Sequence, residues 1–380
     1  MNIRENFPIL NKVVYLDSAC QSLKPKQVIN KINEYYNEYP VCAGRSSHQL
    51  SAKVNEEVYK TRENISKFFN TKKENIIFTR NTTESINIVA NNFKGKKVLI
   101  TDKEHNSNLL PWQRNGNLKV LSSNQDNTFN IEGLKKNLSG VSLVTINHVS
   151  NLDGVINPIK EIVKIAHDND SLVLIDAAQS AGHHEIDFKK LDIDFLACSG
   201  HKMLGPTGTG LLISKKELLE DLEPLNIGGG TVIDSNYDNY KFEEVPFRFE
   251  AGLQDYAGII GLGEAINYLK KVGFNDIEKN ELKLNKILTE ELLDKVELIG
   301  PEDCRLRPSI FSFNLKKFSS HDIAGILNSS KNICIRSGAH CVHSWFNKHN
   351  LKGSARASLY LYNNEGDVNK FIEEIKKLIR

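Results

Sequence analysis

Lys202 lies in the stretch 199–210, whose small residues and glycines are an unusual setting for a lysine, which is normally a solvated surface residue. The apolar run 194–198 precedes this stretch, and its glycines allow the backbone to approach another group closely. Burial lowers the pKa of a lysine amine, and such an amine is a nucleophile toward aldehydes. Short motifs also match by chance, so the stretch alone predicts either a reactive amine or an ordinary glycine-rich turn.

Asp176 and His105 are further candidates, because each follows an apolar run typical of a buried strand. Asp176 is either a helix cap or a solvated loop residue, or it holds the proton of a heterocyclic nitrogen, as the electron sink pyridoxal phosphate (PLP) requires. Gln179, one helical turn later, can donate to a neighbouring phenolate oxygen. His105 either stacks on a flat ring and moves a proton, or is a solvated loop histidine.

A set of hydroxyl and imidazole donors suits one phosphate group. Thr82 and Thr83 precede a helix that the pattern predicts to start near Ile86, and Ser199 and His201 flank Lys202. Free N–H groups and the helix dipole make a helix N-terminus an anion site. The alternative for Thr82 and Thr83 is plain N-capping, which is common.

Cys341 and Arg356 are the candidates of the C-terminal part. Cys341 lies in the glycine-containing stretch 336–342 beside Arg336 and His340, where a thiol can ionise readily. Arg356, among small residues of a predicted strand, either pairs with a structural carboxylate or binds a substrate carboxylate. The alternative for a cysteine is an inert thiol, which we infer for Cys20, Cys42, Cys198, Cys304 and Cys334.

Apolar strands that alternate with helices must position these residues. Unbroken apolar runs of this kind predict a mainly parallel sheet covered by helices on both faces. Ligands of such sheets bind at the carboxyl ends of the strands, where Asp176 and the Lys202 stretch fall. The predicted strands are 13–16, 75–79, 97–100, 141–146, 172–176, 195–198 and 210–213, and the predicted helices are 25–39, 51–69 and 158–168.

The pattern changes after residue 261. Long helices over 261–271 and 277–293, strands over 309–313 and 333–336, and a helix over 367–379 predict a smaller α+β domain. A chain of 380 residues is also long enough for two domains. We therefore expect a cofactor-binding large domain at 15–262, and a small domain from 1–14 and 263–380 that carries the Cys341 stretch.

Composition excludes several classes of function. The 49 basic and 47 acidic residues give a net charge of +2, which predicts neither nucleic-acid nor membrane-surface binding. No run is apolar enough to span a bilayer, and the start of the sequence lacks a signal-peptide core. Six scattered cysteines without a CxxC pair predict no disulfide framework and no metal site. We expect a cytoplasmic protein.

Taken together, these motifs resemble the class V aminotransferase family of fold-type I PLP enzymes, in its cysteine desulfurase and selenocysteine lyase branch. The resemblance implies an α/β fold with a large domain built on a mainly parallel sheet of the seven-stranded type, plus a smaller α+β C-terminal domain. The matching stretches, from about residue 15 to 362, are 78–84, 104–108, 148–151, 176–179, 199–202, 248–252 and 336–341.

The resemblance also implies a role for each candidate. Lys202 would be the Schiff-base lysine, and Cys341 the sulfur acceptor. The other cofactor contacts would be Asp176 to the ring nitrogen, Gln179 to the ring oxygen, His105 stacked on the ring, and Thr83, Ser199 and His201 to the phosphate. Asn151 and Arg356 would bind the substrate carboxylate.

The activity so implied is PLP-dependent removal of sulfur from L-cysteine. It would give L-alanine and a persulfide on Cys341, for iron–sulfur cluster assembly or another thiolation pathway. Such enzymes act as homodimers with a sulfur-acceptor protein. The alternatives are a selenocysteine lyase, a cysteine sulfinate desulfinase, another class V PLP enzyme such as an epimerase or a kynureninase-like hydrolase, or a non-catalytic sulfur-relay scaffold.

The chain departs from the family pattern in three places. The opening motif, residues 17–20, is Asp-Ser-Ala-Cys, where family members often have Asp-Asn-Ala-Ala. Gly44 stands where many relatives have a histidine, just ahead of the stretch 45–48. Leu253 replaces a threonine that reaches the phosphate of the partner subunit in relatives. The change at Leu253 weakens the expected cross-subunit phosphate contact and leaves the Lys202 and Asp176 chemistry untouched.

Overall fold

The structure is a computed structural model that describes residues 3–44 and 46–379. Arg45 of the stretch named above lies outside the described residues, as do residues 1–2 and 380 at the ends of the predicted small domain. No helix within the described ranges is long and apolar enough to cross a membrane.

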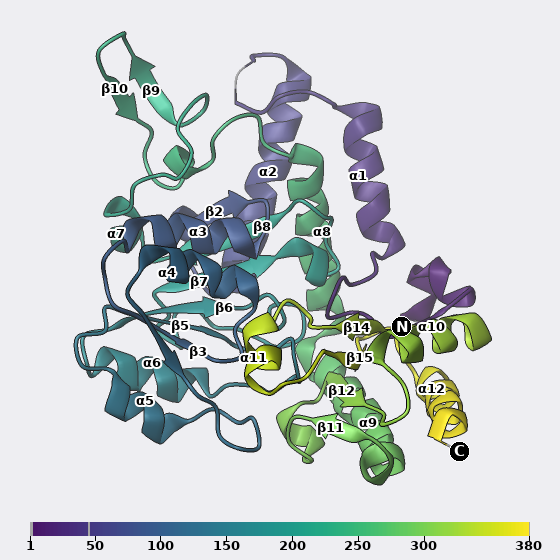
Figure 1. Ribbon diagram of the computed structural model, residues 1–380. Helices are drawn as coiled ribbons and strands as arrows, with labels where there is room; N and C mark the ends of the chain where they lie inside the picture. The colour runs from purple at the N-terminus through teal and green to yellow at the C-terminus, as the bar shows by residue number, and fades with distance from the viewer. Residues whose placement is uncertain (1–2, 45, 380) are drawn as a thin grey trace.

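A seven-stranded sheet organises the larger part of the molecule (Figure 1), in the order β2-β8-β7-β6-β5-β3-β4. Neighbours from β7 to β4 are parallel, whereas β8 is antiparallel to both β2 and β7. The predicted α/β class with a mainly parallel sheet is therefore confirmed. The strands are β2 (Ile76–Thr79), β3 (Val98–Thr101), β4 (Leu118–Leu121), β5 (Leu143–Asn147), β6 (Leu172–Asp176), β7 (Phe195–Ser199) and β8 (Gly210–Ser214).

Alternate side chains of each strand enter cores on opposite faces of this sheet, because strand side chains have a period of two. In β7, Leu196 and Cys198 join one core, while Phe195 and Ala197 join the other. The first core packs against α2 (Gln49–Phe68), α5 (Ile131–Asn137), α6 (Ile159–His167) and α8 (Tyr256–Val272). The second packs against α3 (Thr82–Asn92), α4 (Leu110–Asn115) and α7 (Lys216–Glu220).

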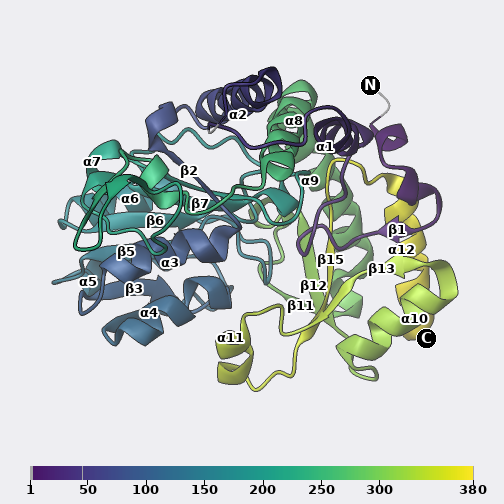
Figure 2. The ribbon, with the colours of Figure 1, turned by 90° about the horizontal axis from the view of Figure 1, so that it is seen from above.

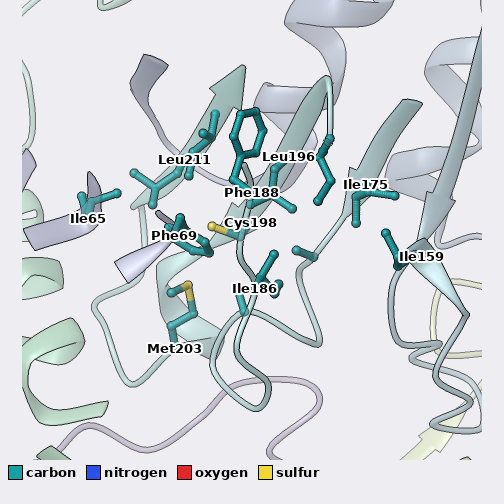
Figure 3. Close-up of a cluster of buried hydrophobic side chains, with 14 of the residues drawn as sticks. Ile65, Phe69, Ile159, Ile175, Ile186, Phe188, Leu196, Cys198, Met203 and Leu211 are labelled. Atoms are coloured by element: carbon teal, nitrogen blue, oxygen red, sulfur yellow. The ribbon is translucent and has the colours of Figure 1, made fainter. Parts of the chain in front are cut away.

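The first core also anchors the loop that carries Lys202. Met203, the next residue, is fully buried in the same core as Cys198 and Leu211 (Figure 3). Gly210 has no room for a side chain, since an added Cβ would lie 2.6 Å from the Cα of Asn81. Met203 thus anchors the Lys202 loop in this core, and Gly210, at the start of β8, lies against Asn81, the N-cap of α3.

A second, four-stranded antiparallel sheet lies beside the first (Figure 2), in the order β11-β12-β15-β14. It shares a separate core with α9 (Phe274–Leu292), α10 (Ser320–Lys331) and α12 (Glu365–Ile379). The strands are β11 (Glu297–Ile299), β12 (Ile310–Asn314), β14 (Arg336–Gly338) and β15 (Ser354–Ser358). The domain boundaries at residues 14 and 262 stay predictions.

The remaining elements lie at the edges of these two parts. β1 (Val14–Tyr15) pairs in parallel with β13 (Ile333–Cys334), and α1 (Lys26–Glu38) packs on α8. β9 (Val232–Ser235) and β10 (Tyr240–Phe242) form a hairpin that projects from the body of the molecule (Figure 1). The short helix α11 (His343–Lys348) follows Cys341.

Two local predictions are corrected. The helix expected near Ile86 begins at Thr82, and its N-cap is Asn81, whose side chain accepts from Glu84 N. Thr82 and Thr83 are therefore first-turn residues rather than caps. The predicted strand 333–336 is two strands, because β13 pairs with β1 whereas β14 pairs with β15.

Candidate active site

A cavity of about 250 Å³ opens at the carboxyl ends of β3, β5, β6 and β7. The rule for parallel sheets predicts a ligand site at this edge. Its lining includes every residue to which the family resemblance assigned a role: Thr83, His105, Asn151, Asp176, Gln179, Ser199, His201, Lys202, Cys341 and Arg356. The cavity is also lined by ten residues to which the family resemblance assigned no role: Ala19, Cys20, Asn81, Thr82, Ser107, Asn147, Val149, Ala178, Arg336 and His340.

Lys202 and Asp176 are the charged pair at the base of the cavity. Lys202 ends the short helix η5 (Gly200–Lys202) directly after β7, and Asp176 is the last residue of β6. Burial lowers the pKa of Lys202, and the charge of Asp176 opposes this effect. Burial likewise raises the pKa of Asp176, against a 2.9 Å hydrogen bond from Ala178 N and the charge of Lys202. The Asp176 carboxylate is thus held where a cation would stabilise its charge.

Gln179 is oriented by the opening motif of the chain. Its Nε2 donates to the carbonyl of Ala19 at 2.7 Å. An amide nitrogen carries two N–H donors, so the second remains for a ligand oxygen in the cavity.

His105 is a neutral imidazole with a defined tautomer. Burial, followed by the charges of Lys202 and Arg356, lowers the pKa of His105 to about 3. Its Nδ1 accepts from Ser107 N at 3.1 Å, so the proton of the neutral ring is on Nε2. A flat, uncharged ring with one N–H donor fits both stacking and proton donation.

Hydroxyl groups gather at the N-terminus of α3. The Ser199 hydroxyl accepts from Thr82 N at 2.9 Å and bonds to Thr82 Oγ1 at 2.7 Å. Thr83 Oγ1 lies 2.7 Å from Ser107 Oγ. Burial and nearby cations lower the pKa of His201 to about 4, so this ring is neutral too. Neutral donors at the positive end of a helix dipole suit a phosphate dianion.

Arg356 is a buried guanidinium whose Nε has no hydrogen-bond partner among the described residues. Its Nη1 donates to the carbonyl of Asn151 at 2.6 Å, and Nη2 lies 3.6 Å from Asp17 Oδ1. The Arg356 side chain is 3% exposed, and a buried charged donor without a partner costs free energy. An anion bound beside it would remove that cost. A ligand carboxylate fits this position.

The Cys341 loop is tied to loops of the larger sheet on both sides. Asn151 Nδ2 donates to the carbonyl of His340 at 2.7 Å, and Asn106 N donates to that of Cys341 at 2.8 Å. His340 and Cys341 both have positive φ, 49° and 59°, a conformation that costs energy for residues other than glycine. These ties hold the thiol at the cavity in a strained turn.

Glu104 is a functional neighbour that sequence reasoning missed. It is 2% exposed, and its carboxylate accepts from Thr101 Oγ1 at 2.5 Å, Asn147 Nδ2 at 3.0 Å and Asn108 Nδ2 at 2.8 Å. Burial first, and then the charge of Asp176, raises its pKa to about 7. Glu104 therefore fixes the loop that carries His105 to β5. Its place after a buried strand was the available signal.

The buried imidazoles predict loss of stability in mild acid. Burial lowers the pKa of His105 to about 3 and of His340 to about 2, so the unfolded chain binds more protons below pH 6.5. Stability should fall from pH 6.5 to 5 by roughly 1–2 kcal/mol for each such histidine, opposed in part by Glu104. Thermal unfolding measured at pH 7 and at pH 5 tests this prediction. The difference in stability between the two pH values should be smaller in His340→Gln than in the wild-type protein, and unchanged in His321→Gln, which alters an exposed histidine. Equal differences in all three proteins would contradict the prediction.

Comparison with known proteins places the chain in a family. The model of the family described as aminotransferase class-V matches residues 14–371. This chain belongs to that family. The class V resemblance that the motifs indicated is therefore confirmed.

Curated class V relatives similar to this chain are named as desulfurases. A protein of Pyrococcus abyssi named "Probable cysteine desulfurase" is 38% identical over 392 residues, covering 100% of this chain and 97% of the relative. One of Halalkalibacterium halodurans with the same name is 38% identical over 396 residues, covering 99% and 97%.

Solved structures agree with these relatives. The apo structure of a cysteine desulfurase from Thermococcus onnurineus is similar with a TM-score of 0.96 and 38% identity, covering 99% of this chain and 97% of the other. An Escherichia coli cysteine desulfurase in an S-sulfonic acid form has a TM-score of 0.91 at 28% identity, covering 98% and 96%. The predicted fold type is therefore confirmed.

Proposed function

We propose that this protein is a PLP-dependent cysteine desulfurase that converts L-cysteine to L-alanine and stores the released sulfur as a persulfide on Cys341. The observation that carries the proposal is the single cavity in which Lys202, Asp176, Arg356 and Cys341 meet. The names of the relatives support the same activity.

The residues present fit PLP. The amine of Lys202 can hold its aldehyde carbon, and Asp176 can accept the proton of its ring nitrogen. Thr83, Ser199 and His201 offer neutral donors for its phosphate, next to the N-terminus of α3. When bound, PLP supplies an electron sink for the charge released at the substrate Cα.

The chain's own residues orient the substrate and move its protons. Arg356 and the Asn151 turn bind the carboxylate of L-cysteine, where the guanidinium Nε has no protein partner. Lys202, whose pKa burial lowers, takes the Cα proton as a free amine. His105 donates from Nε2, the tautomer that Ser107 N fixes.

Cys341 performs the sulfur step. Its thiolate attacks the sulfur of L-cysteine, and an S–S bond forms while the Cβ–S bond breaks. The electron pair of that bond stays on carbon, which is protonated and becomes the methyl group of alanine. The Asn151 and Asn106 contacts hold the Cys341 loop at the substrate during this step.

The test is to mix PLP-loaded protein with L-cysteine and dithiothreitol, and to quantify alanine and sulfide. Equal amounts of both are expected. Parallel assays with L-selenocysteine and cysteine sulfinate decide the substrate preference: the proposal requires the highest kcat/KM for L-cysteine. Protein that binds no PLP, or that forms no alanine, would refute it.

Asp176→Asn is expected to lower kcat about 10- to 100-fold, because a buried charge-assisted hydrogen bond of roughly 1.5–3 kcal/mol is lost. The prediction is tested by measuring the initial rate of alanine formation at saturating PLP. Asp221→Asn, a change of an exposed carboxylate outside the cavity, is the matched control and should keep the wild-type rate. A wild-type rate in Asp176→Asn would remove the ring-nitrogen role.

We also propose a cytoplasmic homodimer that passes its sulfur to an acceptor protein. Exposed apolar side chains support the dimer: Leu253 is 66% exposed, and the projecting hairpin carries Ile233, Tyr237 and Tyr240 (Figure 1). An interface would remove these apolar side chains from water. Sedimentation equilibrium tests it; Leu253→Glu is expected to shift the protein toward monomer.

A further inference from the structure

The active-site cavity contains a second thiol, Cys20, that the proposed mechanism does not use. Cys20 and Cys341 are the two cysteines that line it among the described residues. Both are partly exposed there, whereas Cys198 is buried in the core. Cys42, Cys304 and Cys334 lie outside the lining.

Both parts of the molecule hold Cys20 in place. Its own N–H donates to the carbonyl of Asp17 at 3.1 Å, which closes a turn. The preceding residue, Ala19, accepts from Gln179 Nε2 at 2.7 Å and donates to Ser358 Oγ at 2.9 Å. The turn is thus fixed to β15 on one side and to the cofactor-facing loop after β6 on the other.

The same cavity is built to receive anions. The buried Arg356 Nε has no partner among the described residues, and Arg356 lines the cavity together with both thiols. Burial lowers the pKa of Lys202 and of Arg356; Cys20 opposes this shift at both residues, and Cys341 opposes it at Lys202. Both thiols therefore share one cavity with the cationic side chains of Lys202 and Arg356, and a thiolate is the nucleophile of sulfur exchange.

We propose that Cys20 is a second sulfur carrier that takes the outer sulfur of the Cys341 persulfide and frees Cys341 for another turnover. This inference rests on the proposed function. The Cys20 thiolate attacks the outer sulfur, a new S–S bond forms, and the bond to Cys341 breaks with its electron pair on Cys341. The proton that Cys20 loses is balanced by the one that Cys341 gains, so no oxidant or reductant is consumed. Each chain then stores two sulfurs.

The experiment is a rapid-quench measurement with PLP-loaded protein and L-cysteine, without reductant or acceptor protein. The burst amplitude of alanine is expected to be about two per chain, because each stored sulfur releases one alanine. Cys20→Ser should reduce the burst to about one, and Cys334→Ser, a matched change outside the cavity, should leave it at about two. If Cys20→Ser does not fold, Cys20→Ala and the labelling below take its place.

Alkylation and peptide mass spectrometry locate the stored sulfur. The wild-type protein should carry an added sulfur on the Cys20 and Cys341 peptides, and Cys341→Ser should carry none on Cys20. A burst of one alanine per chain in the wild-type protein, with an unmodified Cys20 peptide, would refute the role of Cys20 and leave the desulfurase activity standing. Added sulfur on Cys20 in Cys341→Ser would overturn its order. No alanine from the wild-type protein would instead refute the proposed desulfurase activity.

Discussion

Replacing Lys202 with alanine is expected to lower kcat for alanine formation from L-cysteine by at least about 10³-fold, since general acid–base catalysis alone contributes about 10²–10⁴-fold. Lys202 stands at the end of η5, directly after β7, and lines the cavity, where burial lowers the pKa of its amine. No other lysine among the described residues lines the cavity, so nothing there replaces its amine.

Two measurements test the Lys202 prediction. Initial rates of alanine formation give the loss of kcat, with the exposed Lys352→Ala as a control that should keep the wild-type rate. Borohydride reduction followed by peptide mass spectrometry should find the cofactor on Lys202 in the wild-type protein and on no lysine of Lys202→Ala. A variant that keeps its rate within tenfold, or that binds PLP covalently elsewhere, would refute the assignment.

Several cofactor-site candidates could be predicted from sequence, because each lies at or just after the end of an apolar run. Asp176 closes β6 and Ser199 closes β7, so the two adjacent parallel strands deliver them to one edge. That geometry follows from the period and direction of the strands. Assignment of roles to Asn151 and Arg356 needed the family resemblance, since neither residue type is diagnostic alone.

Contacts across strands could not be predicted, because they depend on register. Asn147 pairs with Asp176 between β5 and β6 and donates to Glu104, so this register links Glu104 to the end of β6. A glutamate in a polar loop is normally solvated, so its burial has no compositional signal. Cys20 was inferred to be inert for the same reason: the turn that brings it to the cavity depends on Ser358, far along the chain.

In the proposed function, Cys341 decides the reaction more than the cofactor residues do. A Lys202 and Asp176 pair serves many PLP reactions, whereas a nucleophilic thiol is needed to accept sulfur from a thiol substrate. The structure holds Cys341 through its own carbonyl and that of His340, not through its side chain. The sulfur is therefore positioned by backbone contacts that a serine at this position preserves.

Cys341→Ser is accordingly expected to lose at least about 10²-fold of its alanine formation from L-cysteine, because the sulfur acceptor is removed. Exchange of the substrate Cα hydrogen with deuterated solvent, measured by NMR, should continue, since Lys202 carries that step. Cys334→Ser, which changes a thiol outside the cavity, should retain both activities.

Alanine formation and Cα hydrogen exchange together distinguish a variant whose active site is disrupted from one that lacks only the sulfur-transfer step. Loss of both alanine formation and Cα exchange in Cys341→Ser would mean that the loop supports the whole site, and would contradict a role confined to sulfur. Sulfide release at the wild-type rate with dithiothreitol would show that the thiol is not the acceptor. Continued exchange without alanine is the outcome that a nucleophilic Cys341 requires, because proton removal at Cα precedes cleavage of the Cβ–S bond and depends on a different residue.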